Sequence, residues 1–175
     1  MEINRIYFNK LYNELSQPEI SILLGARQVG KSTLMRQLEK AARQKGLTTV
    51  FYDLEQSSDL QKLSGNLKDI THQLISAAQV VFIDEFHYLA NASKIFKAIF
   101  DSRKSLPTGR AIKIYASGSS SLEIHKHLKE SLAGRFIKTM IYPLSIGEWQ
   151  QIPKFQKEQY LQWGGMPGLS QRFDA

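Results

Sequence analysis

Residues 25–32, GARQVGKS, combine two glycines, a lysine and a serine at the spacing G-x-x-x-x-G-K-[ST]. An apolar run at 20–24 precedes them and a helical pattern follows, so the segment links a strand to a helix. Glycines in such a turn let backbone N–H groups wrap a phosphate at the helix N-terminus. The spacing predicts that Lys31 lies on the β- and γ-phosphates of a nucleotide and that the Ser32 hydroxyl binds Mg²⁺. The predicted nucleotide-binding residues are Gly25, Ala26, Arg27, Gln28, Val29, Gly30, Lys31, Ser32 and Thr33.

A second candidate site follows the apolar strand predicted at 80–83, where the chain continues with Asp84 and Glu85. A carboxylate at the end of a buried strand downstream of the phosphate loop is placed to hold Mg²⁺, and we assign that role to Asp84. Glu85 lies just beyond the strand, where it can turn toward the nucleotide and take a proton from an attacking water. A surface acid or a helix start is the alternative for Glu85. A general base here favours hydrolysis over transfer to a bound acceptor.

The next predicted strand, residues 112–116, leads into a run of serines. In nucleotide hydrolases of this plan, a polar residue at this strand end senses the γ-phosphate or positions the water. We choose Ser117 for that catalytic role and Ser119 as second choice. Capping of the helix predicted at 119–130 is the alternative. A serine nucleophile is not expected, because the segment does not match G-x-S-x-G.

Strands and helices alternate along the chain. Short apolar strands separated by helices form right-handed crossovers and a mostly parallel sheet with helices on both faces. The predicted fold class is therefore α/β. Further strands are predicted at 48–52 and 136–141, helices at 31–44 and 92–102, and a mostly helical stretch at 59–78, after an opening helix that ends near residue 17.

The composition excludes several classes of protein. With 175 residues, 42% of them hydrophobic and 22% charged, the chain is neither disordered nor fibrous, and its length predicts one domain. The absence of cysteine excludes disulfides and thiolate zinc sites. There is no apolar run near the length of a membrane span and no secretory pattern at the start, so we expect a cytoplasmic protein without a membrane span.

The net charge of +7 comes from one stretch of the chain. Residues 94–138 carry 10 Lys and Arg against 3 Asp and Glu, whereas residues 1–93 and 139–175 each carry as many basic as acidic residues. A local basic surface is a candidate site for nucleic acid. A solvated surface without a partner is the alternative, because no single run of basic residues is dense.

Six motifs occur in an order that carries a resemblance. They are GARQVGKS at 25–32, IDE at 83–85, GSSS at 118–121, LAGR at 132–135, YPLS at 142–145 and GGMP at 164–167. Only the first is specific alone, but the ordered series resembles the prokaryotic AAA-type ATPases related to the archaeal-ATPase and STAND groups of P-loop NTPases. The resemblance covers nearly the whole chain and implies a P-loop NTPase fold of the additional-strand type. A five-stranded parallel sheet in the order 5-1-4-3-2 is implied with it.

The resemblance also implies roles for two residues beyond the phosphate loop. Arg135 would contact the γ-phosphate, within its own chain or as a finger from a neighbouring subunit, and Pro167 would pack near the adenine. Because Arg135 precedes the strand at 136–141, it enters that strand at the end opposite the nucleotide. That position favours a neighbouring subunit or a structural ion pair. Residues 1–150 are expected to form the ATPase core and residues 151–175 the start of a small helical lid, truncated before a further C-terminal domain.

The motifs together favour an MgATP-binding ATPase of the AAA/STAND-like kind that drives or switches a partner. Two alternatives remain open: an ATP-gated interaction switch with little turnover, and a small-molecule P-loop kinase. A GTPase is disfavoured, because no guanine-reading [NT]-K-x-D motif follows the later strands. The expected partners besides the nucleotide are a protein or a second copy of the chain. The expected cofactors are ATP and Mg²⁺, the catalytic residues Lys31, Glu85, Ser117 and Arg135, and the metal ligands Ser32 and Asp84.

Overall fold

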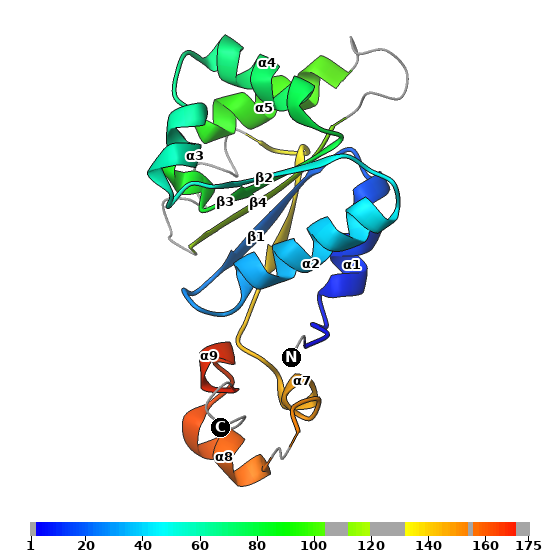
Figure 1. Ribbon diagram of the computed structural model, residues 1–175, viewed down its shortest axis with the longest axis vertical. Helices are drawn as coiled ribbons and strands as arrows, with labels where there is room; N and C mark the ends of the chain where they lie inside the picture. The colour runs from blue at the N-terminus through cyan, green and yellow to red at the C-terminus, as the bar shows by residue number, and fades with distance from the viewer. Residues whose placement is uncertain (1–2, 104–111, 120–131, 154–155, 171–175) are drawn as a thin grey trace.

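A parallel sheet of five strands forms the centre of the computed structural model, which describes residues 3–103, 112–119, 132–153 and 156–170 (Figure 1). The strands lie in the order β2-β3-β4-β1-β5, and every neighbouring pair is parallel. Counted from the β5 edge, this is the implied order 5-1-4-3-2, so the expected fold is confirmed. The strands are β1 (Ile20–Gly25), β2 (Thr49–Asp53), β3 (Val80–Asp84), β4 (Lys113–Ser119) and β5 (Phe136–Met140).

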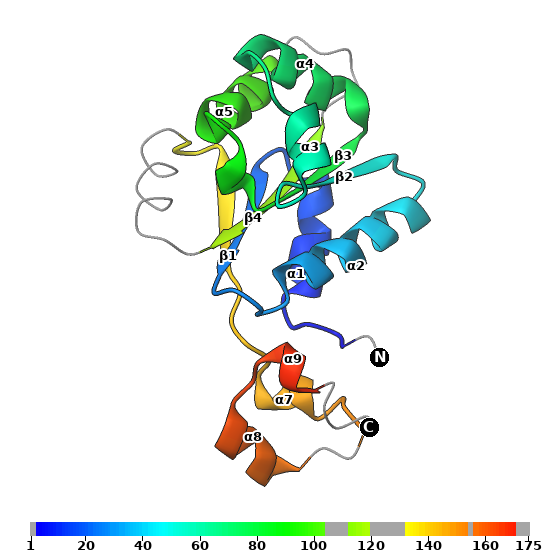
Figure 2. The ribbon, with the colours of Figure 1, turned by 60° about the vertical axis from the view of Figure 1, so that its left-hand side comes forward.

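Helices cover both faces of the sheet (Figures 1 and 2). On one face, Leu34 and Leu38 share a buried cluster with Phe82 of β3. On the other face, Ile95 belongs to a second cluster that includes Ile83. Neighbouring strand residues point to opposite faces, which is why the uninterrupted apolar run of β3 serves both clusters. The first face carries α1 (Phe8–Asn13), η1 (Glu14–Ser16) and α2 (Lys31–Gln44), and the second carries α3 (Ser57–Lys62), α4 (Leu67–Ala77), η2 (Phe86–Tyr88) and α5 (Ala92–Ser102).

The predicted bounds are confirmed for α2 and α5, and those of β1, β2, β3 and β5 differ by at most one residue at either end. The mostly helical stretch expected over 59–78 consists of two helices, which separate where Gly65 has a φ of +152° and Asn66 begins α4 by accepting a hydrogen bond from the Asp69 amide at 2.9 Å. Strand β4 runs past its predicted end at residue 116 to Ser119, since it stays paired with β1 up to Gly25. Ser119 is therefore a strand residue, and the rest of the helix expected at 119–130 lies outside the described residues.

A small C-terminal unit lies beyond the carboxyl ends of the central strands (Figure 1). It consists of α7 (Ile146–Trp149), α8 (Lys157–Trp163) and α9 (Pro167–Ser170). Leu144, Trp149 and Ile152 form its buried cluster, against which Tyr160 packs. Helix α7 thus packs with the unit that follows residue 150, while the division into domains at that residue stays a prediction. No described helix is long and apolar enough to cross a membrane.

Lys113 is a buried cation within β4, with 4% of its surface exposed. Burial lowers its pKa from 10.5 to about 8, although Glu14 and Glu19 raise it in part. The folded state therefore binds this proton less tightly than the unfolded state, and the charged ammonium destabilises the fold fully below pH 8. As the pH rises from 8 toward 10.5, the folded chain loses the proton first and the wild type gains stability.

We expect Lys113→Met to raise the free energy of unfolding at pH 7 by roughly 1–3 kcal/mol, and the gain at pH 9 to be about 1 kcal/mol smaller. The gain falls short of the full pKa effect because the substitution also removes the 2.6 Å hydrogen bond from Nζ to the Glu19 carbonyl. Denaturant titration at the two pH values measures both quantities. Lys94→Met, at an exposed position, provides the control for the Lys-to-Met substitution itself. A gain that is independent of pH would contradict the assignment.

Candidate functional site

The phosphate loop joins the carboxyl end of β1 to the start of α2. Gly25 is the last strand residue, and a Cβ atom there would lie 2.3 Å from the Ile141 carbonyl oxygen, so no larger residue fits. Gln28 and Gly30 have φ angles of 64° and 89°. A left-handed backbone at a non-glycine residue is uncommon and marks a loop held in a defined shape. Alternating right- and left-handed residues of this kind turn backbone N–H groups into an anion-binding concavity.

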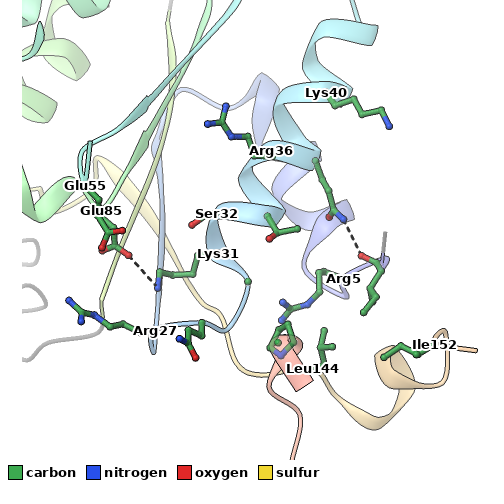
Figure 3. A pocket seen from close by; sticks show the side chains of 17 residues that line it. Arg5, Arg27, Lys31, Ser32, Arg36, Lys40, Glu55, Glu85, Leu144 and Ile152 are labelled. Carbon is green, nitrogen blue, oxygen red and sulfur yellow. Dashed lines mark hydrogen bonds and ion pairs between the residues drawn. The ribbon is translucent and has the colours of Figure 1, made fainter. Parts of the chain in front are cut away.

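Lys31 extends across the mouth of this loop. Its ammonium donates to the carbonyls of Gly25 at 3.2 Å and Ala26 at 3.0 Å, and only 4% of the residue is exposed. On its remaining side the ammonium faces Glu85, whose Oε1 lies 3.7 Å from Lys31 Nζ (Figure 3). The structure therefore brings together the loop lysine and the carboxylate chosen from sequence as the general base, 54 positions apart in the chain.

Asp84 and Ser117 meet at the carboxyl ends of the adjacent strands β3 and β4. The Ser117 hydroxyl donates to Asp84 Oδ1, which also accepts the Glu85 amide at 3.2 Å. Both side chains are buried. Among the described residues, Asp84 Oδ2 has no recorded donor, so one carboxylate oxygen is left for another ligand. Ser117 therefore contacts the proposed metal ligand, and a role at the γ-phosphate stays a prediction.

Glu85 follows β3 in a left-handed conformation, with φ 52° and ψ 50°. This backbone turn directs the Glu85 side chain toward the loop, so that it no longer follows the alternation of strand side chains between the two faces of the sheet. Its Oε2 lies 3.1 Å from His87 Nδ1, so the two carboxylate oxygens face two different nitrogen-bearing groups. The sequence-based expectation that Glu85 can turn inward past the strand end agrees with this geometry.

A cavity of about 980 Å³ opens beside the loop (Figure 3). Seven of the predicted binding residues line it: Arg27, Gln28, Gly30, Lys31, Ser32, Thr33 and Pro167. The other three loop residues do not line the cavity: Gly25 and Val29 are buried, and Ala26 is exposed. The cavity wall is rich in cations, since Arg5, Arg36 and Lys40 join Arg27 and Lys31 against two carboxylates, Glu55 and Glu85. Such a balance suits a polyanionic ligand.

Arg135 lies outside this cavity. Its carbonyl accepts the amide of Ile20 at 3.0 Å, which places it at the amino end of β1, opposite the phosphate loop. Its guanidinium pairs with Asp101 at 3.0 Å. Arg135 thus lies away from the phosphate loop of its own chain, and its role at the γ-phosphate, in its own chain or at the site of a second copy, stays a prediction.

Sequence reasoning missed several lining residues. Arg36 and Lys40 follow Ser32 at intervals of four on α2, so helical periodicity counted from Ser32 signals both. Arg5 precedes the first helix and has no such signal. Leu144 and Ile152 reach the cavity from the C-terminal segment, through tertiary packing that no local pattern predicts.

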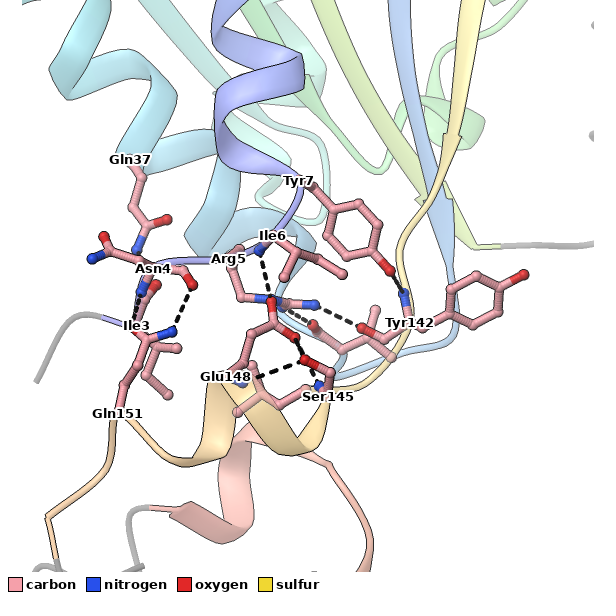
Figure 4. A network of polar contacts seen from close by, with 12 residues as sticks. Ile3, Asn4, Arg5, Ile6, Tyr7, Gln37, Tyr142, Ser145, Glu148 and Gln151 are labelled. Atoms are coloured by element: carbon pink, nitrogen blue, oxygen red, sulfur yellow. Dashed lines mark hydrogen bonds and ion pairs between the residues drawn. The ribbon is translucent and has the colours of Figure 1, made fainter.

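Arg5 connects the phosphate loop with the C-terminal unit (Figure 4). Its guanidinium donates to Glu148 Oε1 at 2.8 Å, to the Val29 carbonyl at 2.7 Å and to the Tyr142 carbonyl at 2.7 Å. Glu148 belongs to α7, where Oε2 closes a capping box with Ser145. Burial raises the pKa of Glu148, but hydrogen bonds from the amides of Ser145 and Ile6, and then from Arg5, outweigh it and lower that pKa. The carboxylate is thus held ionised beside the arginine.

The basic stretch 94–138 is only in part a free surface. Lys113 is buried, and the guanidinium of Arg103 stacks over the Phe100 ring at 3.5 Å. Arg135 is paired with Asp101. A nucleic-acid site here therefore stays a prediction. The described residues that remain exposed are Lys94, Lys97 and Lys138, while Lys104, Arg110, Lys126 and Lys129 lie outside the described residues.

Comparison with known proteins agrees with the fold. A family model described as an AAA domain matches residues 17–150. An uncharacterized protein of Haemophilus influenzae is 24% identical over 179 aligned positions, which cover 93% of this chain and 43% of that protein. The chain thus spans less than half the length of this curated relative.

Solved structures with low sequence identity share the fold. AMPPCP-bound DnaA from Aquifex aeolicus superposes with a TM-score of 0.62 at 15% identity, covering 98% of this chain and 60% of that one. A Walker-type ATPase of Pyrococcus abyssi gives 0.62 at 20% identity, over 97% of this chain and 65% of that one. Aeropyrum pernix Orc1 in complex with DNA gives 0.59 at 12% identity, over 91% and 51%. At these identities the likeness concerns the fold alone.

Proposed function

This chain belongs to the AAA domain family of P-loop ATPases, and from that premise we propose that it binds MgATP beside the phosphate loop and hydrolyses it. The observation that carries the proposal is the convergence of Lys31 and Glu85 at the loop mouth, with 3.7 Å between Nζ and Oε1. An ammonium for phosphate charge and a carboxylate for a water proton are the two groups that this reaction requires side by side.

In the proposed reaction, a water oxygen bonds to the γ-phosphorus while the bond from that phosphorus to the β–γ bridging oxygen breaks. Glu85 accepts the proton of the water, and ADP and inorganic phosphate leave. Lys31 and the loop amides stabilise the negative charge on the phosphate oxygens. Because the Lys31 ammonium is held by backbone carbonyls on one side, it needs little reorganisation to meet the nucleotide on the other.

The proposed Mg²⁺ ligands are the Ser32 hydroxyl and the Asp84 carboxylate. Magnesium binds few protein oxygens and keeps waters and phosphate oxygens as its other ligands, so two hard oxygen donors are a suitable set. The oxygen of Asp84 without a recorded donor supports this fit. When bound, the ion would neutralise charge on the β- and γ-phosphates.

The proposed adenine site lies between the loop and the C-terminal unit. Pro167 lies 3.6 Å from the position of a Cβ atom on Gly30, and Leu144 and Ile152 line the same wall of the cavity. These apolar groups suit a flat base. A slowly hydrolysing ATP switch is the second candidate function, because both Glu85 oxygens face Lys31 and His87 in this conformation.

The test combines binding with turnover. We expect unlabelled ATP to displace a fluorescent ATP analogue at lower concentration than GTP, since no guanine-reading group is proposed in the cavity. Phosphate release from ATP should require magnesium and stop on addition of EDTA. Binding without release would favour the switch, and equal or reversed potency of GTP would contradict the proposed adenine site.

A further inference from the structure

Arg5 lies outside the six motifs, yet its guanidinium makes three hydrogen bonds at the cavity wall. The residue is 7% exposed, and its partner Glu148 is 1% exposed. We propose that Arg5 is a positioning residue of the phosphate site: by holding the Val29 carbonyl it sets the direction of the Gly30 N–H, and Glu148 of α7 holds Arg5 in turn. This inference rests on the proposed nucleotide binding.

The hydrogen bond from Arg5 fixes the orientation of one peptide unit, the one between Val29 and Gly30. A trans peptide is planar, and its C=O and its N–H point in opposite directions. Arg5 Nη1 donates to the Val29 oxygen at 2.7 Å, so the N–H of Gly30 in the same plane points away from Arg5. Within the part of the chain that the structure describes, this N–H has no recorded backbone acceptor. Gly30 lines the cavity, where a phosphate oxygen can accept it.

The peptide between Val29 and Gly30 needs a contact from outside the loop to keep its orientation. Gly30 has a φ of 89° and lacks a Cβ atom, so its backbone turns between conformations at little cost. A flipped Val29–Gly30 peptide would point its carbonyl oxygen toward the phosphate and repel it. A charge-assisted hydrogen bond from a buried guanidinium is about twice as strong as a neutral one and stabilises the productive orientation.

Arg5 is held in place by a residue of the C-terminal unit, Glu148. Glu148 Oε1 accepts Arg5 Nε at 2.8 Å and the Ile6 amide at 2.9 Å, while Oε2 accepts the Ser145 amide at 2.7 Å. Replacing such a buried pair with apolar groups is often neutral or stabilising, so its contribution to folding does not explain it. A rigid guanidinium that satisfies three acceptors in fixed directions is instead suited to positioning.

Binding of two ligands that share the diphosphate tests the proposal. We expect Arg5→Gln to weaken magnesium pyrophosphate and MgADP by a similar factor, about tenfold or more, measured by titration calorimetry. In ATP hydrolysis the KM should rise by a comparable factor while kcat changes much less, because the N–H contact exists before and during the reaction. Glu148→Gln should shift both affinities in the same direction by a smaller factor.

Two further variants separate positioning from charge and from folding. Arg5→Lys keeps a cation, but its single nitrogen cannot reach the three separate oxygens that the Nε, Nη1 and Nη2 atoms of arginine contact, so we expect it to lose affinity as Arg5→Gln does. It also carries the test if Arg5→Gln fails to fold. Arg43→Gln breaks the 2.7 Å pair between the exposed Arg43 and the buried Glu39, neither of which lines this cavity, and should change neither ligand's affinity.

Three results would overturn the inference while the proposed function stands. These are wild-type affinity in Arg5→Lys, unchanged pyrophosphate binding with weaker MgADP, and a fall in kcat at unchanged KM. The second result would show that Arg5 acts on binding of the adenine and not of the diphosphate. The third would show that Arg5 stabilises the transition state and not the bound substrate. A wild-type chain that binds no nucleotide would instead overturn the proposed function.

Discussion

Replacement of Lys31 with alanine is expected to weaken MgATP binding at least about 100-fold. The ammonium is 4% exposed and sits between two loop carbonyls and the Glu85 carboxylate. Removing it takes away the cation that would meet the β- and γ-phosphates. It also leaves the negative charge of Glu85 facing the nucleotide without that partner, so repulsion adds to the lost attraction.

Displacement of a fluorescent ATP analogue measures this loss. Lys40→Ala is the matched control, because Lys40 lines the same cavity from the same helix but is exposed to solvent, where a charge contributes much less. Thermal unfolding without nucleotide checks that each variant is folded. An affinity of Lys31→Ala within threefold of the wild type would show that the nucleotide does not bind at this loop.

The parts of the fold that depend on a local sequence pattern were predictable. Strand β3 is an uninterrupted apolar run because it is buried on both faces, and α2 begins at the lysine of the loop motif. The mostly helical character of residues 59–78 was predicted, but the break between α3 and α4 was not located, although Gly65 and Asn66 signal it. The length of β4 was missed because its last residues are held by pairing with β1, which the sequence alone does not reveal.

The candidate site divides in the same way. The positions of Lys31 and Glu85 beside the loop were predictable, because Lys31 belongs to a sequence motif and Glu85 follows the end of an apolar strand. Arg5 was not, because its importance arises from Glu148, 143 positions later, and from a carbonyl oxygen that every residue possesses. Residues that act through backbone atoms of distant segments leave no spacing to detect in a single sequence.

The substitution Glu85→Gln is expected to preserve MgATP binding and to lower the rate of hydrolysis by about 10²–10⁴. Glutamine has the shape of glutamate but its amide cannot accept the proton of an attacking water. The left-handed backbone of Glu85, with φ 52°, directs this side chain toward the loop, and an uncharged side chain of the same length can keep that backbone conformation. Affinity should stay the same or rise slightly, because Lys31 is released from its 3.7 Å ion pair.

Phosphate release at saturating ATP measures the rate, and nucleotide displacement measures the affinity of the same preparation. Glu55→Gln is the matched control: Glu55 is the other carboxylate of the cavity wall, and it is exposed, so its variant should keep the wild-type rate. Hydrolysis by Glu85→Gln at the wild-type rate would show that the water loses its proton elsewhere. The pairing of Glu85 with Lys31 and His87 would then serve to hold the loop closed rather than to supply the base.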